Sequence, residues 1–310
     1  MLTPTRWRMK RWIMLDEAIL KTLCYRDLFD YPLTEEEMSE FLVGEFAHPP
    51  EIQRVLAQLT AERKIGVTDG FFHLLGRERI ARTRREREEI GERKWARALK
   101  LARLLRVLPW VRAVFLTGAL AAGNAEKDAD LDFLILTRVN RVWLTRLIAY
   151  TLFTLLGVKR KRGVEEAPDR VCLNMFLADT ALAVPEDGQN LFTAHEVALA
   201  RPLWAKDYLH QRFLGENPWV KKFLPNLHIP ETKIPARSDL SLMRRLADYL
   251  LTVADLVLRR AQLVYMAKRR TRETVERNRI MFHPIDLSHE ILAAYRVKLY
   301  SELHRNPRLL

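Results

Sequence analysis

Apolar positions recur every three or four residues over the first sixty residues of the chain, and this spacing predicts helices. One helix is expected over residues 15–29. Thr34 and Glu37 have the spacing of a capping box, which predicts the start of a second helix. A third helix is expected to begin at Pro49, with one apolar face formed by Ile52, Val55, Leu56 and Leu59.

A short β-hairpin is expected after the third helix. Two apolar runs, residues 65–67 and 71–74, flank the pair Asp69-Gly70, which favours a tight turn. Three helices followed by a hairpin are the element order of a winged-helix domain, and we assign residues 1–76 to such a domain. Its third helix carries mixed charges, so packing or protein contact is favoured over sequence-specific DNA binding, which stays an open alternative.

Residues 77–107 predict one long charged helix. It holds twelve Lys or Arg residues and five Glu residues, so it accounts for more than half of the positive surplus of the chain. Two interpretations are open. The charges form ion pairs between residues four apart on a solvated helix, or they form part of a phosphate-binding face.

The apolar pattern changes after residue 108, where short apolar runs predict strands over residues 111–116, 131–136 and 170–177. An apolar helix is expected over residues 141–157. It is short for a membrane span and contains Arg146, so we expect it to be buried between the sheet and a neighbouring domain, and we expect no membrane partner.

The chain after residue 190 has an almost wholly helical pattern. Residues 193–205 predict one helix, and residues 240–279 form the longest helical run. The fold class expected from the whole pattern is α/β of the α+β type, with a small mixed sheet. Residues 77–190 form the core with its leading basic helix, and residues 191–310 form a C-terminal helical domain.

Composition narrows the expected partners. The chain has 310 residues and a formal net charge of +13, which favours polyanions such as nucleotides and RNA. Cys24 and Cys172 are its only cysteines, and both lie in apolar runs. This pattern argues against a disulfide framework and predicts a reducing, cytoplasmic location.

The stretch LTGALAAGNAEKDADLDFLIL, residues 116–136, carries the candidate chemistry. Asp130 and Asp132 stand two positions apart on a predicted strand, so both side chains point to one face, where their repulsion is costly without a cation between them. A hard divalent ion such as Mg²⁺ prefers oxygen ligands and brings phosphate with it. Gly118 has no side chain, so phosphate oxygens can approach the backbone there. The stretch therefore predicts a site for a metal ion and a nucleoside triphosphate.

This stretch resembles the core motif of the DNA-polymerase-β-type nucleotidyltransferase superfamily. The matching residues are Thr117-Gly118-Ala119, a gap of ten residues, and Asp130-Leu131-Asp132-Phe133. The resemblance covers about residues 87–178, and a winged-helix unit ahead with a helical region behind is similar to a bacterial branch of that superfamily. It implies Mg²⁺ or Mn²⁺ as cofactor, Asp130 and Asp132 as catalytic metal ligands, and Thr117, Gly118 and Ala119 at the nucleotide.

The sequence departs from the family pattern at two positions. Ala119 stands where a serine or a second glycine is usual, so a hydroxyl contact to the triphosphate is missing. On the third strand, where the family has a third carboxylate, Asn174 is the polar interior residue, and its amide oxygen is a weaker ligand that cannot take a proton. Asp169 and Asp179 flank this strand and are alternatives for the third position.

A second candidate pair, His195 and Glu196, follows Thr193. These residues fit a catalytic His-Glu pair, but the spacing of Thr193 and Glu196 also fits a capping box, which we favour.

Two functions are predicted. The first is Mg²⁺-dependent transfer of a nucleoside monophosphate from an NTP to a hydroxyl of an RNA end, a protein or a small molecule. The second is a catalytically weak or inactive nucleotidyltransferase-like regulator that binds nucleotide or nucleic acid, with DNA possible through the winged helix.

Overall fold

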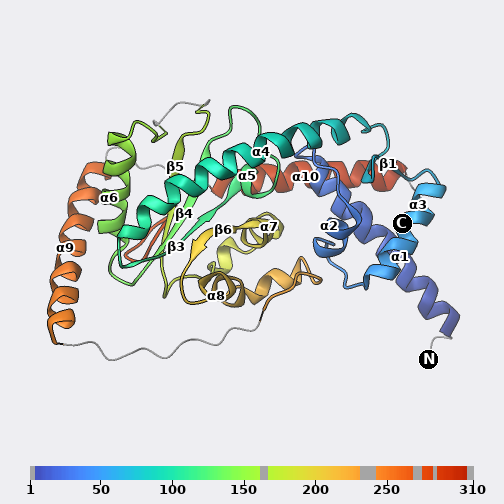
Figure 1. Cartoon of the computed structure of the whole chain (residues 1–310). Helices are drawn as coiled ribbons and strands as arrows, with labels where there is room; N and C mark the ends of the chain where they lie inside the picture. Colours follow the sequence, from blue (N-terminus) through green and yellow to red (C-terminus); the bar gives the residue numbers. More distant parts are fainter. Residues whose placement is uncertain (1–3, 161–166, 231–241, 268–273, 282–284, 306–310) are drawn as a thin grey trace.

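The computed structural model describes residues 4–160, 167–230, 242–267, 274–281 and 285–305 (Figure 1). The N-terminal unit contains three helices and a two-stranded hairpin, as the sequence predicts: α1 (Pro4–Asp27), α2 (Glu35–Glu40), α3 (Pro49–Ala61), β1 (Ile65–Thr68) and β2 (Phe71–Leu74). The capping box that opens α2 is confirmed, because Glu37 N donates to Thr34 Oγ1 at 3.2 Å and Thr34 N donates to Glu37 Oε2 at 3.1 Å. The hairpin turn is confirmed as well, since Asp69 and Gly70 both have positive φ, 54° and 84°.

A six-stranded mixed sheet forms the centre of the molecule. Its order is β6-β3-β4-β5-β8-β7; β4 and β5 run parallel and the other neighbours run antiparallel. The strands are β3 (Val111–Leu116), β4 (Leu131–Thr137), β5 (Val171–Ala178), β6 (Arg201–Ala205), β7 (Thr274–Val275) and β8 (Arg279–Met281). The expectation of a mixed α and β protein with a small mixed sheet is therefore confirmed.

The expectation that the chain is almost wholly helical after residue 190 is wrong at two places. The helix expected over residues 193–205 ends at residue 199, and residues 201–205 form β6 at the edge of the sheet beside β3. Pro202 cannot donate a backbone hydrogen bond inside a helix, whereas an edge strand accepts it. The helical run expected over residues 240–279 ends at residue 267, and residues 274–281 hold β7 and β8, which extend the sheet beyond β5.

Helices cover both faces of the sheet (Figure 1). They are α4 (Arg79–Leu104), α5 (Gly118–Ala121), α6 (Val142–Leu155), α7 (Leu191–Leu199), α8 (Leu209–Gly215), α9 (Leu242–Ala267) and α10 (Ile285–Arg305), with short 3₁₀ turns at residues 105–107, 186–188 and 218–222. Within the described part of the chain, none of these helices combines the length and the apolar character that a membrane span requires.

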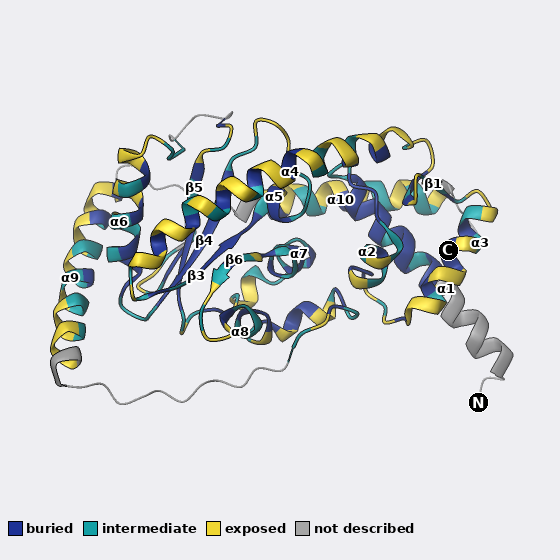
Figure 2. Cartoon of the chain, in the orientation of Figure 1, coloured by how far each residue is buried: buried dark blue, intermediate teal, exposed yellow. Residues whose placement is uncertain are grey.

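Two apolar clusters fill the molecule, one on each face of the sheet. On one face, α4 and α6 pack on the strands through residues such as Ala98, Trp143 and Phe153. On the other face, Phe115 and Leu134 belong to a cluster that continues into α1, α3 and α7. Figure 2 shows the central strands buried between these layers, and Figure 1 shows α10 returning beside α1. The N-terminal unit therefore shares its core with one face of the sheet.

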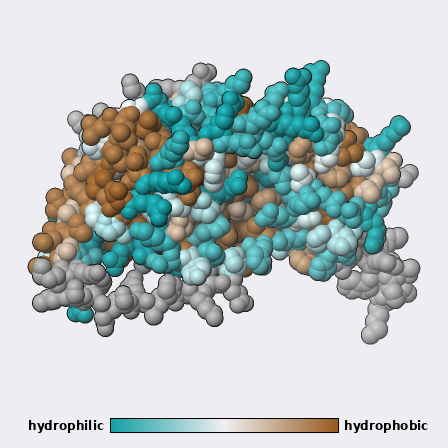
Figure 3. Space-filling view, viewed as in Figure 1, coloured by the Kyte–Doolittle hydropathy of each residue, from teal (hydrophilic) through white to brown (hydrophobic). Residues whose placement is uncertain are grey.

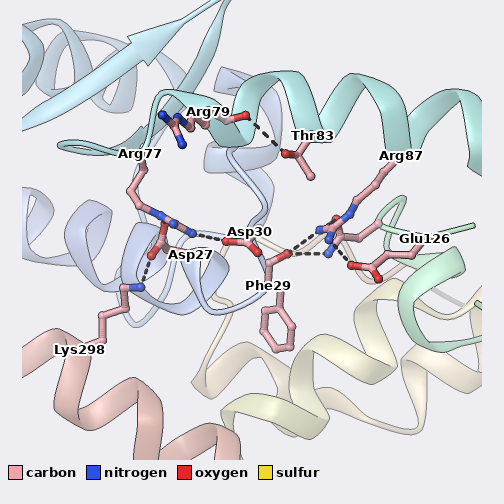
Figure 4. Close-up of polar contacts among 10 residues, drawn as sticks. Asp27, Phe29, Asp30, Arg77, Arg79, Thr83, Arg87, Glu126 and Lys298 are labelled. Carbon is pink, nitrogen blue, oxygen red and sulfur yellow. Dashed lines mark hydrogen bonds and ion pairs between the residues drawn. The ribbon is translucent and has the colours of Figure 1, made fainter. Parts of the chain in front are cut away.

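Basic residues of α4 join the N-terminal unit to the loop that precedes β4 (Figure 4). Arg87 donates to the carbonyl oxygen of Phe29 at 3.1 Å and to Asn124 Oδ1 at 2.9 Å, and it pairs with Glu126. Asn124 Nδ2 also donates to Phe29 O at 2.8 Å. Just before α4, Arg77 pairs with two aspartates of the N-terminal unit. Ion pairs within α4 also form, as between Arg82 and Glu86, but Arg87 makes a tertiary contact that the spacing of charges did not reveal.

Candidate functional site

The turn after β3 brings Gly118 against the first residues of β4. Leu116 pairs with Phe133, and Thr117 N donates to the carbonyl oxygen of Asp132 at 3.0 Å. Gly118 then takes φ +67°, a left-handed conformation, and a Cβ built on it would lie 2.7 Å from Asp132 Oδ2. Only glycine leaves this space beside the carboxylate. Ala119 is exposed and lines the same cavity as Gly118 and Asp132.

Asp130 and Asp132 converge as their spacing predicts, with Asp130 placed just before β4, which begins at Leu131. Carboxylate oxygens of both residues and the sulfur of Cys172 all lie within 4.8 Å of one another. Burial raises the pKa of Asp132 to about 7, and the negative charge of Asp130 adds to this shift. Arg160 offsets part of it, because a guanidinium nitrogen of Arg160 donates to Asp130 Oδ2 at 2.5 Å.

Strand β5 brings a cysteine, and no carboxylate among the described residues, to the pair formed by Asp130 and Asp132. Asp132 on β4 pairs with Cys172 on β5, and the register then shifts before Leu134 pairs with Met175. Asn174 lies on β5 within this irregular segment, and its side chain is outside the described residues. Cys172, which the motif did not single out, therefore stands opposite Asp132. Burial raises the pKa of its thiol, and the negative charges of Asp132 and Asp130 raise it further.

Neither flanking aspartate belongs to the cluster that Asp130, Asp132 and Cys172 form among the described residues. The carboxylate of Asp169 accepts a hydrogen bond from Lys94 of α4 at 3.0 Å. Asp179 comes directly after Ala178, which pairs with Thr137 of β4. Thr137 is five residues from Asp132 along this strand, a separation of roughly 16 Å. We therefore exclude both residues from the third position.

The two carboxylates fit a hard divalent cation. Their charges repel each other at close range, they lie at the site where Gly118 leaves open space, and their oxygens are the donors that Mg²⁺ and Mn²⁺ prefer. The sulfur of Cys172 does not fit such an ion, because it is a soft ligand and Mg²⁺ prefers oxygen. The residues that could hold the ion are thus Asp130 and Asp132.

A cavity of about 430 Å³ adjoins Asp132, whereas Asp130 is not one of its lining residues. Its walls are mostly apolar. They come from the N-terminal unit, from the face of the sheet that carries Leu134 and Met175, and from α7, α8 and α10. Gly118 and Asp132 lie at one part of its wall, and Glu196 of α7 lines it as well. Burial raises the pKa of Glu196 to about 7, and the charge of Glu196 raises the pKa of Asp132 in turn.

Arg26 of α1 also lines the cavity, with only 4% of its surface exposed. Its guanidinium lies over the rings of Tyr31 and Phe41, 4.5 Å and 5.0 Å from their centroids. Nε and one terminal nitrogen have no hydrogen-bond partner among the described residues. Burial lowers the pKa of this guanidinium. A buried cation with unused donors beside a cavity is an arrangement that a bound anion would stabilise.

The interpretation of residues 193–196 as a capping box is wrong. The N-cap of α7 is Asn190, and the reciprocal bonds join Asn190 and Thr193, at 3.0 Å each. Glu196 is therefore left to line the cavity. His195 is buried, stacks on Tyr25 with centroids 4.1 Å apart, and has its pKa lowered to about 3, so it is a neutral core residue.

Sequence reasoning did not place Glu196 or Arg26 at the site. Glu196 belongs to the His195–Glu196 pair noted in the sequence, but the favoured interpretation placed it in a capping box, and its position depended on where α7 begins. Arg26 lies in the last turn of α1, where a basic residue is ordinary, and the sequence holds no signal that it is buried. No family model matches this chain, and comparison with curated proteins and with solved structures found no match.

Proposed function

We propose that this chain is a divalent-cation-dependent nucleotidyltransferase that moves a nucleoside monophosphate from an NTP to a hydroxyl group of an RNA end, a protein or a small molecule. The observation that supports it most directly is the position of Gly118 against Asp132, with Asp130 converging on the same place. When bound by these carboxylates, Mg²⁺ or Mn²⁺ supplies charge that neutralises the triphosphate.

The residues around the cavity take the remaining roles in this proposal. The turn at Gly118 leaves room for phosphate oxygens, and Arg26 offers its unused donors to the same anionic group. The acceptor oxygen forms its bond to the α-phosphorus while the bond to pyrophosphate breaks, and Glu196 accepts the proton of the hydroxyl. The apolar walls enclose an uncharged part of one substrate and exclude water.

The decisive experiment is nucleotide binding followed by label transfer. Each of the four NTPs, labelled in the α-phosphate, is titrated into the protein with and without Mg²⁺, and then incubated with RNA, protein and small alcohols as acceptors. We expect Mg²⁺-dependent binding that Asp130→Asn with Asp132→Asn abolishes. Asp128→Asn is the matched control, because Asp128 is an exposed residue of the same loop. Unchanged nucleotide affinity in a folded double variant would sink the proposal.

A second function is favoured by two observations at the same site. Cys172 stands opposite Asp132, where the family has a carboxylate, and Arg160 pairs with Asp130. Both fit a nucleotidyltransferase-like regulator that binds nucleotide or nucleic acid without transfer. Mg²⁺-dependent binding without label transfer to any acceptor supports this function, whereas transfer that depends on Asp132 excludes it. The N-terminal unit, which has the winged-helix element order, is the candidate DNA-binding part in either case.

A further inference from the structure

Helix α9 departs from the usual amphipathic arrangement, because several polar side chains lie on its inward face. These side chains lie against α6: Asp248 Oδ1 accepts from Arg141 at 2.5 Å, and Asp255 Oδ1 accepts from the backbone N–H of Leu144 at 2.8 Å. Gln262 Nε2 donates to the carbonyl oxygen of Trp143 at 2.9 Å. A surface helix ordinarily turns its apolar face inward. The inward face of α9 combines these hydrogen bonds with apolar contacts of Leu263 and Met266, and a second, exposed apolar face remains outside.

The outward face of α9 carries a stripe of exposed aliphatic residues, which we call the α9 stripe. Its members are Leu246 (55% exposed), Leu250 (59%), Val253 (42%), Val257 (60%) and Val264 (76%). Tyr249 and Tyr265 flank it and are 65% and 63% exposed. Figure 3 shows apolar residues gathered over α6 and α9 on the visible face of the molecule. Contiguous apolar surface of this size marks an interaction site.

The spacing of the α9 stripe is that of a helix–helix seam. Its positions are separated by alternating steps of four and three residues, with Arg260 completing the series between Val257 and Val264. This is the a/d spacing of a coiled coil, and a narrow a/d line is the seam through which one helix packs on another. From Leu246 to Val264 it extends roughly 27 Å. The stripe thus indicates a helical partner more than a flat membrane surface.

We propose that the α9 stripe binds the α9 stripe of a second copy of this chain, in an antiparallel pair around a two-fold axis level with Asp255. The positions of the stripe are symmetric about that residue. Antiparallel pairing sets Leu246 against Val264 of the copy and Val253 against Val257, as an isologous interface requires.

The remaining position also satisfies this symmetry. Leu250 faces Arg260 of the copy, where the methylene groups of the arginine cover the leucine and its guanidinium reaches solvent. The exposed side chains of the stripe and its two tyrosines offer an area on the order of 700 Å², close to the roughly 800 Å² per partner of a standard interface.

Light scattering coupled to size exclusion, over a hundredfold range of protein concentration, tests the pairing. We expect the full chain to have twice its mass of 36.4 kDa. Val257→Glu places a charge in the centre of the seam and is expected to give a folded monomer. Val297→Glu is the matched control, because Val297 is a 73% exposed valine on α10, and this variant is expected to stay dimeric.

Cysteine cross-linking tests the orientation. In the antiparallel pair, Leu246→Cys with Val264→Cys forms a disulfide between copies, whereas Leu246→Cys alone does not. A cross-link with the single variant contradicts the antiparallel arrangement.

Two outcomes of light scattering overturn the proposal: a monomeric full chain at every concentration, or a dimer that Val257→Glu leaves intact. Binding of a monomeric full chain to anionic vesicles, lost in Val257→Glu, would instead assign the stripe to a membrane surface. Circular dichroism of Val257→Glu establishes that a monomeric result reflects a folded protein.

Discussion

Gly118 and Asp132 lie so close together that a methyl group on Gly118 would stand 2.7 Å from Oδ2 of the aspartate. They are fourteen residues apart in the chain, and the antiparallel pairing of β3 with β4 brings them together. The glycine meets two separate demands, a positive φ and the absence of a Cβ beside the carboxylate. This double demand distinguishes it from the other glycines with positive φ.

Gly118→Ala is expected to disturb the site as well as the fold. The left-handed conformation costs alanine about 1 kcal/mol, and displacement of Asp132 adds a further cost. Gly157→Ala is the control, because Gly157 has φ +65° and no atom within 4 Å of a built Cβ. Urea denaturation should show a larger loss of stability for Gly118→Ala, and only this variant should lose Mg²⁺-dependent nucleotide binding. Equal losses in the two variants would contradict the close contact.

Arg26→Met is expected to change stability and binding in opposite directions. Removal of a buried cation with unused donors should leave the free protein unchanged or stabilise it by about 1–3 kcal/mol. The same change should weaken NTP binding by tenfold or more, because the phosphates lose a charged partner. Thermal unfolding and a nucleotide titration measure the two effects.

Arg84→Met provides the contrast to Arg26→Met. Arg84 is equally well buried, but it pairs with Glu37 and Glu88. Its removal leaves a carboxylate without its partner and should destabilise the protein. An Arg26→Met variant that is destabilised to the same extent would show that Arg26 has a structural partner.

Glu196→Gln is expected to stabilise the protein at alkaline pH. The pKa of Glu196 is raised from 4.5 to about 7 in the folded state, so the folded protein holds the proton more tightly than the unfolded chain. The contribution of Glu196 to wild-type stability should therefore fall as pH rises from about 4.5 to about 7. Glu196→Gln should remove this part of the loss, while Asp132, whose pKa is also raised to about 7, keeps its own part. At pH 8 the free energy of unfolding should rise by an amount on the order of 2 kcal/mol in this variant, after allowance for the solvent that reaches the cavity.

The gain of Glu196→Gln should vanish below about pH 4, where the glutamate is protonated in both states. Urea denaturation across this pH range measures it. A gain that is independent of pH would show that the amide stabilises the site by packing. Under the proposed function, the same variant also loses label transfer while it keeps nucleotide binding, because only the proton acceptor is removed.

Arg87→Ala is expected to release the loop before β4 from the N-terminal unit. Arg87 contacts Phe29 O, Asn124 and Glu126, so its loss removes most of this connection. Hydrogen exchange over residues 122–128 should rise severalfold, while exchange in β4 stays unchanged. Arg82→Ala is the control, since the Arg82 side chain is 88% exposed and pairs with Glu86 on the same helix. Equal rates of hydrogen exchange over residues 122–128 in the two variants would contradict this role of Arg87.

Local chemistry made part of the structure predictable. The Thr34–Glu37 capping box, the Asp69-Gly70 turn and the strands at residues 111–116 and 131–136 depend on neighbours in sequence, and each was confirmed. The convergence of Asp130 and Asp132 was predictable for the same reason, because alternation along one strand determines which side chains share a face. Expectations about the nucleotide and its metal ion stay predictions that the experiments above test.

The sequence by itself thus determined many of the local elements, the carboxylate pair and the glycine beside it, since each of these follows from backbone geometry over a few residues. Only the tertiary structure decided that residues 201–205 extend the sheet, that Cys172 faces Asp132, and that Arg26 and Glu196 line one cavity with it. These outcomes depend on strand register and on contacts between segments far apart in the chain. Burial in such contacts also gives Glu196 its raised pKa and leaves an apolar side of α9 facing outward.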